Sequence, residues 1–113
     1  MERGILAVQT EAAPGEEEAF NAWYDDVHVP EILATPGFSS CRRFRARTSP
    51  LAGPGRAGEW ASYLAVYEIV ARDVVDAHTD LLERVRAGRL TQSESVASHP
   101  YRSQLFEQIA ERR

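Results

Sequence analysis

The sequence has little of what identifies many enzyme classes, because it holds one cysteine, Cys41, and none of the common metal or nucleotide motifs. A single cysteine cannot form a disulfide within the chain, so we predict a protein of the reducing cytoplasm. CxxC pairs, HExxH and glycine-rich phosphate loops are absent from the sequence, which excludes several classes of metalloenzyme and nucleotide-dependent enzyme.

Membranes and nucleic acids are also poor partners for this sequence. No apolar run approaches the roughly 20 residues that cross a bilayer, and the first ten residues lack the pattern of a signal peptide. The net charge of −4 argues against nucleic acid. The length of 113 residues and the 43% hydrophobic content predict one domain, over residues 1–113, with a single core.

Four segments have the patterns of strands. Gly4–Thr10 and Glu59–Val70 are apolar at both alternating sets of positions, which predicts strands buried on both faces. Phe38–Thr48 alternates without a helical period and predicts a third strand. Tyr101–Glu111 fits a strand or a helix, and we choose a strand because the sheet otherwise lacks an edge.

Two helices are predicted between these strands. The first begins at the acidic run Glu16–Glu18, and Pro30 should end or kink it, with a short helical turn possible beyond. The second begins after a capping Asp73 and stops at Gly88. The proline- and glycine-rich segment Ser49–Gly58 predicts a loop.

The predicted order is β-α-β-β-α-β, which is typical of ferredoxin-like α+β domains with an antiparallel sheet. In such a domain both helices cover the same face of the sheet. Two strands here are apolar on both sides, so the other face needs a partner. We therefore predict a homodimer in which two sheets pack face to face.

Residues 21–38, NAWYDDVHVPEILATPGF, resemble the EthD-like group of the dimeric α+β barrel superfamily, whose pattern is close to N-x-W-Y-D-x-x-H-x-P-x-x-L-x-x-P-G-F. The matching positions are Asn21, Trp23, Tyr24, Asp25, His28, Pro30, Leu33, Pro36, Gly37 and Phe38, with Arg43 following. The resemblance implies the same fold, a dimer, and a pocket between helices and sheet with the histidine at its edge. The superfamily includes cofactor-free monooxygenases, polyketide cyclases, isomerases, haem-degrading enzymes and proteins without an assigned activity, so the reaction stays open.

His28 is the main candidate for chemistry. On an ideal helix Phe20, Trp23 and Val27 mark the core-facing stripe, and His28 lies about 90° from its centre, where a side chain can face a pocket. A histidine with an ordinary pKa of about 6.5 transfers protons near neutrality. The alternative is that His28 caps the end of the helix before Pro30. The motif favours the catalytic interpretation.

Four neighbours on the same helix are candidate partners of His28. Tyr24 would donate a hydrogen bond to a developing enolate oxygen. Asn21 or Asp25 would orient the imidazole, and the spacing leaves open which of Asn21, Asp25 and Glu17 touches it. With His28, the residues Tyr24, Asn21 and Asp25 make up the predicted catalytic set.

Candidate substrate-binding residues come from the second helix and the third strand. His78 lies on the apolar stripe of the second helix, where core packing is the commoner role. If the helices lie side by side, His28 and His78 approach the same cavity. Tyr63 and Tyr67 share one strand face, opposite Trp60, and either pack in the core or wall an aromatic substrate.

Arg43 is the arginine nearest the motif, and it is predicted to clamp a carboxylate or stabilise an enolate. Trp23 is assigned to packing and, together with Phe38, counted among the residues that contact a substrate. His99, in a polar loop, is predicted to be solvated. The histidine spacing gives no compact ligand set, so neither a metal nor another cofactor is predicted.

These residues support three hypotheses about function. The first is a small cofactor-independent enzyme that moves a proton next to the carbonyl of an aromatic or polyketide-like compound, in a cyclisation, isomerisation or elimination. The second is a cofactor-free monooxygenase of phenols, which needs the same deprotonation. The third is a non-catalytic dimer that binds a small apolar ligand or assists another enzyme. A cavity of a few hundred Å³ beside His28 would favour an enzyme.

Overall fold

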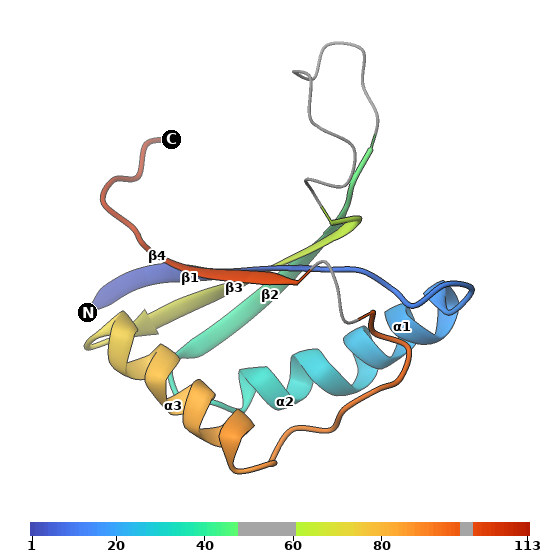
Figure 1. The fold of residues 1–113 in the computed structure, drawn as a ribbon. Coiled ribbons are helices and arrows are strands. Elements are labelled where there is room, and N and C mark those ends of the chain that lie inside the picture. Colours follow the sequence, from blue (N-terminus) through green and yellow to red (C-terminus); the bar gives the residue numbers. More distant parts are fainter. Residues whose placement is uncertain (48–60, 98–100) are drawn as a thin grey trace.

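Four antiparallel strands form one sheet, and all helices lie on the same side of it (Figure 1). The computed structural model describes residues 1–47, 61–97 and 101–113. The strands are β1 (Glu2–Thr10), β2 (Phe38–Arg45), β3 (Tyr63–Ala71) and β4 (Arg102–Glu107), and their order in the sheet is β2-β3-β1-β4. The helical elements are α1 (Glu17–Trp23), the π-helical turn η1 (Tyr24–His28), α2 (Val29–Leu33) and α3 (Val74–Arg86).

The order and pairing of the elements confirm the predicted ferredoxin-like α+β fold. The last segment, where strand and helix were both open, is the edge strand β4, paired with β1. The strand predicted over Glu59–Val70 is described from Tyr63, and the first strand begins two residues earlier than predicted. The predicted loop Ser49–Gly58, and with it Trp60 and His99, lie outside the described residues.

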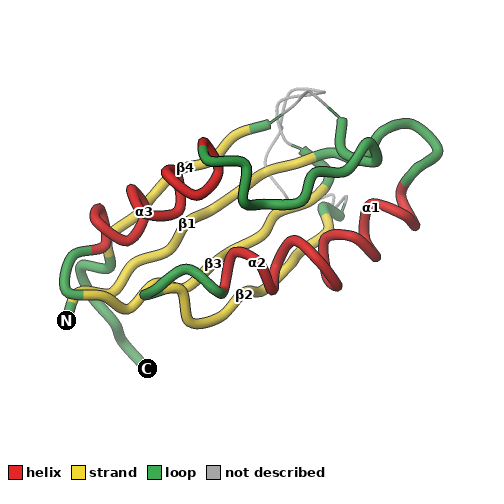
Figure 2. Tube along the Cα trace, turned by 90° about the horizontal axis from the view of Figure 1, so that it is seen from below, coloured by secondary structure: helices red, strands yellow, loops and turns green. Residues whose placement is uncertain are grey.

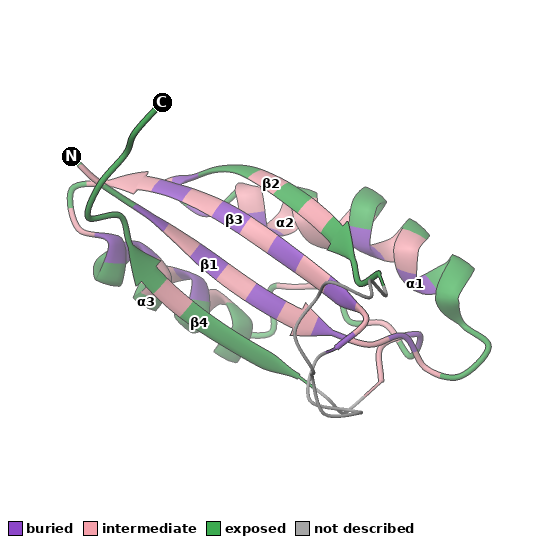
Figure 3. Ribbon diagram, turned by 90° about the horizontal axis from the view of Figure 1, so that it is seen from above, coloured by how far each residue is buried: buried purple, intermediate pink, exposed green. Residues whose placement is uncertain are grey.

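The two central strands bury alternate residues against the helices, as the period of two in a strand requires. Leu6 and Val8 of β1 and Tyr67 and Ile69 of β3 belong to the core. The intervening residues on the opposite face are only partly buried, as the alternating bands along β1 and β3 in Figure 3 show. The sheet therefore has one fully covered face and one open, partly apolar face.

The first helical region does not end at Pro30, because a wider turn precedes the proline. The N–H of Val29 bonds to the carbonyl of Tyr24, five residues earlier, and the helix continues through Pro30 to Leu33. A π-helical turn holds more residues than the 3.6 of an α-helix. It shifts the orientation of every residue that follows.

This shift corrects the predicted core stripe. On an uninterrupted α-helix Ile32 would lie about 120° from Phe20, and one extra residue in the turn reduces that angle to about 20°. The buried residues are accordingly Phe20, Tyr24 and Ile32. Trp23 is partly buried against the core, but Val27 is not part of it, so that prediction was wrong.

The predicted ends of the second helix are confirmed. The Asp73 carboxylate accepts hydrogen bonds from the N–H groups of Val75 and Asp76, at 2.8 and 3.1 Å. Gly88 follows α3 with a φ of +70°, the left-handed conformation of a helix stop. Val85, near the end of α3, is 46% exposed. Within residues 1–47, 61–97 and 101–113, no helix has the length and apolar character needed to cross a bilayer.

Candidate functional site

A cavity of about 300 Å³ lies between η1, α3 and the covered face of the sheet. Its inner wall is apolar and includes Leu6 and Val8 from β1 and Leu81 from α3. His28 from η1 and His78 from α3 both line it. The structure therefore brings the two predicted histidines to one cavity of the size that small-molecule sites have.

A segment that follows α3, residues 90–97, forms much of the remaining wall, and we call it the strap. Figures 1 and 2 show the chain leave α3 and run towards α1 on the helix side of the sheet. Five of its side chains line the cavity: Leu90, Thr91, Gln92, Ser93 and Val96. The strap thus combines apolar and uncharged polar groups around one side of the cavity.

The His28 ring is packed between two aromatic residues of its own helix. It stacks on Trp23 with ring centroids 4.6 Å apart and meets the Tyr24 ring edge-on at 4.8 Å. Burial, which disfavours the charged imidazolium, lowers the pKa of His28 to about 4. Its Nδ1 atom is buried and has no hydrogen-bond partner among the described residues. His28 is therefore a neutral imidazole at neutral pH.

Tyr24 also lines the cavity, but its hydroxyl group belongs to a buried tyrosine pair. The Tyr67 hydroxyl donates a hydrogen bond to the Tyr24 oxygen over 3.3 Å. Burial raises the pKa of Tyr24 to about 12 and raises the pKa of Tyr67 as well. The Arg43 guanidinium lies 4.3 Å from the centre of the Tyr24 ring. Both phenols stay protonated, and the position of Tyr24 is fixed by these contacts.

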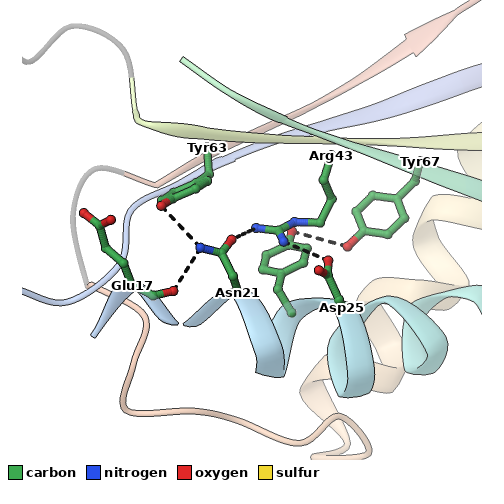
Figure 4. Close-up of polar contacts among 7 residues, drawn as sticks. Glu17, Asn21, Asp25, Arg43, Tyr63 and Tyr67 are labelled. Carbon is green, nitrogen blue, oxygen red and sulfur yellow. Dashed lines mark hydrogen bonds and ion pairs between the residues drawn. The ribbon is translucent and has the colours of Figure 1, made fainter. Parts of the chain in front are cut away.

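A polar network holds the other side of the same helix to the sheet (Figure 4). Arg43 donates hydrogen bonds to Asp25 and Asn21, each over 2.8 Å. The Asn21 amide donates in turn to the Tyr63 hydroxyl over 3.3 Å and to the Glu17 carbonyl over 2.9 Å. We call Asn21, Asp25, Arg43 and Tyr63 the clamp, because together they join the helix to β2 and β3.

The predicted site residues fall into two groups. Those that line the cavity are Trp23, Tyr24, His28 and His78. Those that lie outside its lining are Asn21, Asp25, Phe38, Arg43, Tyr63 and Tyr67. The roles assigned to all of them in catalysis or binding stay predictions.

Several cavity residues were missed by the sequence reasoning. The strap residues Thr91, Gln92 and Ser93, and Tyr101 and Ser103 at the start of β4, all contribute to the lining. They lie in or beside an irregular polar stretch, which has no periodicity that could predict a direction for each side chain. The residues that the structure describes contain no group of three or more histidine, cysteine or acidic side chains that could hold a metal ion.

Comparison with known proteins gives structural neighbours only. No protein-family model matches the chain, and no curated protein does. A proposed monooxygenase from Shewanella loihica PV-4 superposes with a TM-score of 0.63 at 13% identity, over 98% of this chain and 99% of that one.

Two further neighbours carry the name of the family that the motif resembles. An EthD-like protein from Ralstonia eutropha JMP134 has a TM-score of 0.58 at 14% identity, covering 99% of this chain and 96% of that one. An EthD family protein from Bacillus halodurans C-125 has a TM-score of 0.53 at 14% identity, over 96% of this chain and 100% of that one. The chain therefore has the fold of EthD-like proteins, and the resemblance of its motif is confirmed at the level of the fold.

Proposed function

We propose that this protein is a small enzyme that moves a proton next to the carbonyl of an apolar, aromatic or polyketide-like compound, with His28 as the acid/base group. The observation that carries the proposal is the position of a neutral, half-buried His28 on the wall of a cavity of about 300 Å³. Proton transfer to an imidazole requires no cofactor.

The low pKa of His28 leaves the imidazole unprotonated at neutral pH but weakens it as a base, so proton transfer depends on the charge of the enolate that forms beside it. At neutral pH the imidazole is unprotonated and can accept a proton from the carbon beside a ketone. The enolate that forms is an anion next to the new imidazolium, and this opposite charge raises the histidine pKa while the pair exists. Returning the proton at another carbon completes an isomerisation, and loss of a leaving group completes an elimination.

The surrounding residues have supporting roles in this proposal. The clamp and the tyrosine pair fix the Tyr24 ring, which meets the His28 ring edge-on, so Asn21, Asp25 and Arg43 act on the histidine indirectly. His78 faces the same cavity, and burial lowers its pKa too, so it is a second uncharged hydrogen-bonding group for a substrate.

The experiment that tests the proposal is deuterium exchange into 2-tetralone, a neutral aromatic ketone, followed by NMR in D2O. We expect the protein to accelerate exchange at the carbon between the ring and the carbonyl, and His28→Gln to lower that acceleration about a hundredfold or more. Thr79→Val, on the exposed side of α3, is the matched control and should leave the rate unchanged. Binding of the ketone with no exchange above the His28→Gln level would instead indicate a ligand-binding module.

A second candidate reaction is cofactor-free oxidation of a phenol, in which the deprotonated substrate itself reacts with dioxygen. The fold shared with a proposed monooxygenase favours it, and the same base would start it. An oxygen electrode separates the two reactions. Oxygen uptake that depends on a phenolic substrate and on His28 supports oxidation, and exchange without oxygen uptake supports the first reaction.

We also propose that the open face of the sheet pairs with a second copy of the chain. Phe44 and Phe106, on opposite edge strands of this face, are 49% and 50% exposed, and Phe44 and Leu64 line a groove of about 230 Å³. These exposed apolar side chains, together with the partly buried apolar residues of β1 and β3 between them, favour an interaction surface on this face. Sedimentation equilibrium should give twice the 12.6 kDa mass of the chain, and a monomer at micromolar concentration would contradict the proposal.

A further inference from the structure

The strap supplies a cluster of uncharged polar side chains to the cavity. Thr91, Gln92 and Ser93 stand in sequence along its wall, whereas the facing wall is largely aliphatic. None of the described residues that line the cavity is an aspartate, glutamate, lysine or arginine. A ligand carrying a net charge would find no counter-ion there, and burying an unpaired charge is costly. The site therefore fits a neutral ligand with one polar end.

The two halves of the strap are held in different ways. Its C-terminal half is tied to the chain after β1, because the N–H of Ala13 bonds to the Ser95 carbonyl at 2.7 Å and the N–H of Ala97 bonds to the Glu11 carbonyl at 2.8 Å. Its N-terminal half carries the polar side chains that line the cavity. Within the part of the chain that the structure describes, the hydrogen bonds from that half to another element run from Thr91 to the Glu31 carboxylate, with the Thr91 N–H at 2.6 Å.

Glu31 connects this half of the strap to the helix that carries the base. It lies on α2, three residues after His28, so one rigid helical turn joins the two groups. The hydrogen bonds from Thr91 lower the pKa of Glu31, which keeps the carboxylate charged at neutral pH. A charged acceptor makes the stronger kind of hydrogen bond to a backbone N–H. The contact thus fixes the polar side chains of the strap relative to His28.

We propose that Glu31 is a positioning residue that holds the strap through Thr91 so that Gln92 and Ser93 bind the oxygen atom of a neutral, otherwise apolar ligand in the cavity beside His28. This inference rests on the proposed function, because it assumes that the ligand occupies the same cavity. It adds the substrate class, which is an uncharged compound whose oxygen lies at the strap. It also identifies Glu31 as the residue that determines the selectivity for that oxygen.

The test compares two ligands of nearly equal shape, 2-acetylnaphthalene and 2-ethylnaphthalene, which differ in the carbonyl oxygen. We expect the wild-type protein to bind the ketone more tightly. Glu31→Ala should weaken ketone binding about three- to tenfold, the range for one hydrogen bond to a partly exposed charge, and leave hydrocarbon binding nearly unchanged. Glu31→Gln keeps an acceptor for the Thr91 N–H and should restore part of the preference. Glu83→Ala, on the exposed side of α3, is the control.

A second readout follows the strap itself. Amide hydrogen exchange at Thr91 should be faster in Glu31→Ala than in the wild-type protein, with the α3 amides unchanged. If Glu31→Ala folds poorly, Glu31→Gln carries both measurements, because its side chain has the same shape without the charge.

The outcomes separate this inference from the proposed function. Equal weakening of both ligands, or no change in either, overturns the positioning role of Glu31 and leaves the cavity as the binding site. Failure of the wild-type protein to bind either naphthalene overturns both proposals. A lost preference for the ketone with normal hydrocarbon binding supports the inference.

Discussion

The two sides of the helix over residues 17–33 differ in whether their polar groups have hydrogen-bond partners. On the side facing β2, Arg43 has both a carboxylate and an amide oxygen as partners, and the Asn21 amide bonds in turn to a tyrosine and a carbonyl. On the side facing α3, an open cavity adjoins His28, whose Nδ1 has no partner among the described residues. The hydrogen-bonded side contributes stability, and the side with space and an unpaired polar atom is the one where we propose that a ligand binds.

The largest effect on stability is expected from the clamp. Arg43→Met removes two hydrogen bonds and the guanidinium over the Tyr24 ring, and it leaves the Asn21 oxygen without its donor. The Arg43 side chain is 17% exposed and that of Asp25 is 60% exposed, so the pair is partly screened. We expect the free energy of unfolding to fall by about 2 kcal/mol in urea denaturation.

The exchange activity of Arg43→Met tests whether the two sides of the helix have separate roles. Under conditions in which Arg43→Met is folded, its rate of exchange into 2-tetralone should change far less than that of His28→Gln. Arg72→Met, at an exposed position with no hydrogen-bonded partner among the described residues, serves as the control for stability. A clamp variant that loses exchange activity as completely as His28→Gln would contradict the separation of the two sides.

A smaller effect on stability is expected from the protonation of His28, on the cavity side of the helix. The pKa of His28 is about 4 in the folded protein and 6.5 in the unfolded chain, so the unfolded chain binds a proton first as the pH falls. The contribution of the neutral histidine is fully present above pH 6.5 and is lost between 6.5 and 4. Relative to His28→Gln, the wild-type protein should lose about 1–2 kcal/mol across this window, after allowance for partial exposure.

Urea denaturation of the two proteins at a series of pH values measures this difference. Because the same carboxylates titrate in both, including Glu31 beside the histidine, their contributions largely cancel in the comparison. If the unfolding free energies of the two proteins changed in parallel between pH 6.5 and 4, His28 would titrate normally in the folded protein, and its burial would not lower its pKa.

The smallest effect is expected from a pair of tyrosine variants. Tyr67→Phe removes the donor to the Tyr24 hydroxyl and should cost about 1 kcal/mol, measured as a lower melting temperature. Tyr101→Phe, at a position 58% exposed on the rim of the cavity, should change stability by less than about 0.5 kcal/mol. Equal losses in the two variants would mean that the tyrosine pair contributes nothing specific.

The sequence predicted the fold because its signals are local and repeated. The short apolar runs of β1 and β3, the Asp73 cap and the Gly88 stop each depend on a few neighbouring residues, and all agree with one topology. The placement of His28 beside a helix–sheet pocket followed from the resemblance to a family. These parts needed no knowledge of contacts between distant segments.

The parts that escaped prediction depend on such contacts. An ideal helical wheel assumes an unbroken α-helix, so it placed Val27 in the core and gave no indication that Ile32 shares a face with Phe20. The hydrogen-bond partners of Arg43 are Asp25 and Asn21, which lie on the first helix, 18 and 22 residues earlier in the chain. The strap acquires its position from Glu31, 60 residues earlier in the chain, and no spacing rule covers that distance.

The π-helical turn has a consequence for how this helix tolerates change in length. It sets the angle between two halves of one helix, so that Phe20 packs against Tyr63 of the sheet while Ile32 lines the cavity and Glu31 bonds to the strap. Deleting one residue within Tyr24–His28 would restore a regular α-helix and turn the second half by about 100° about its axis. Glu31 would then point away from Thr91 although neither residue had changed. In this helix the number of residues determines direction as well as length.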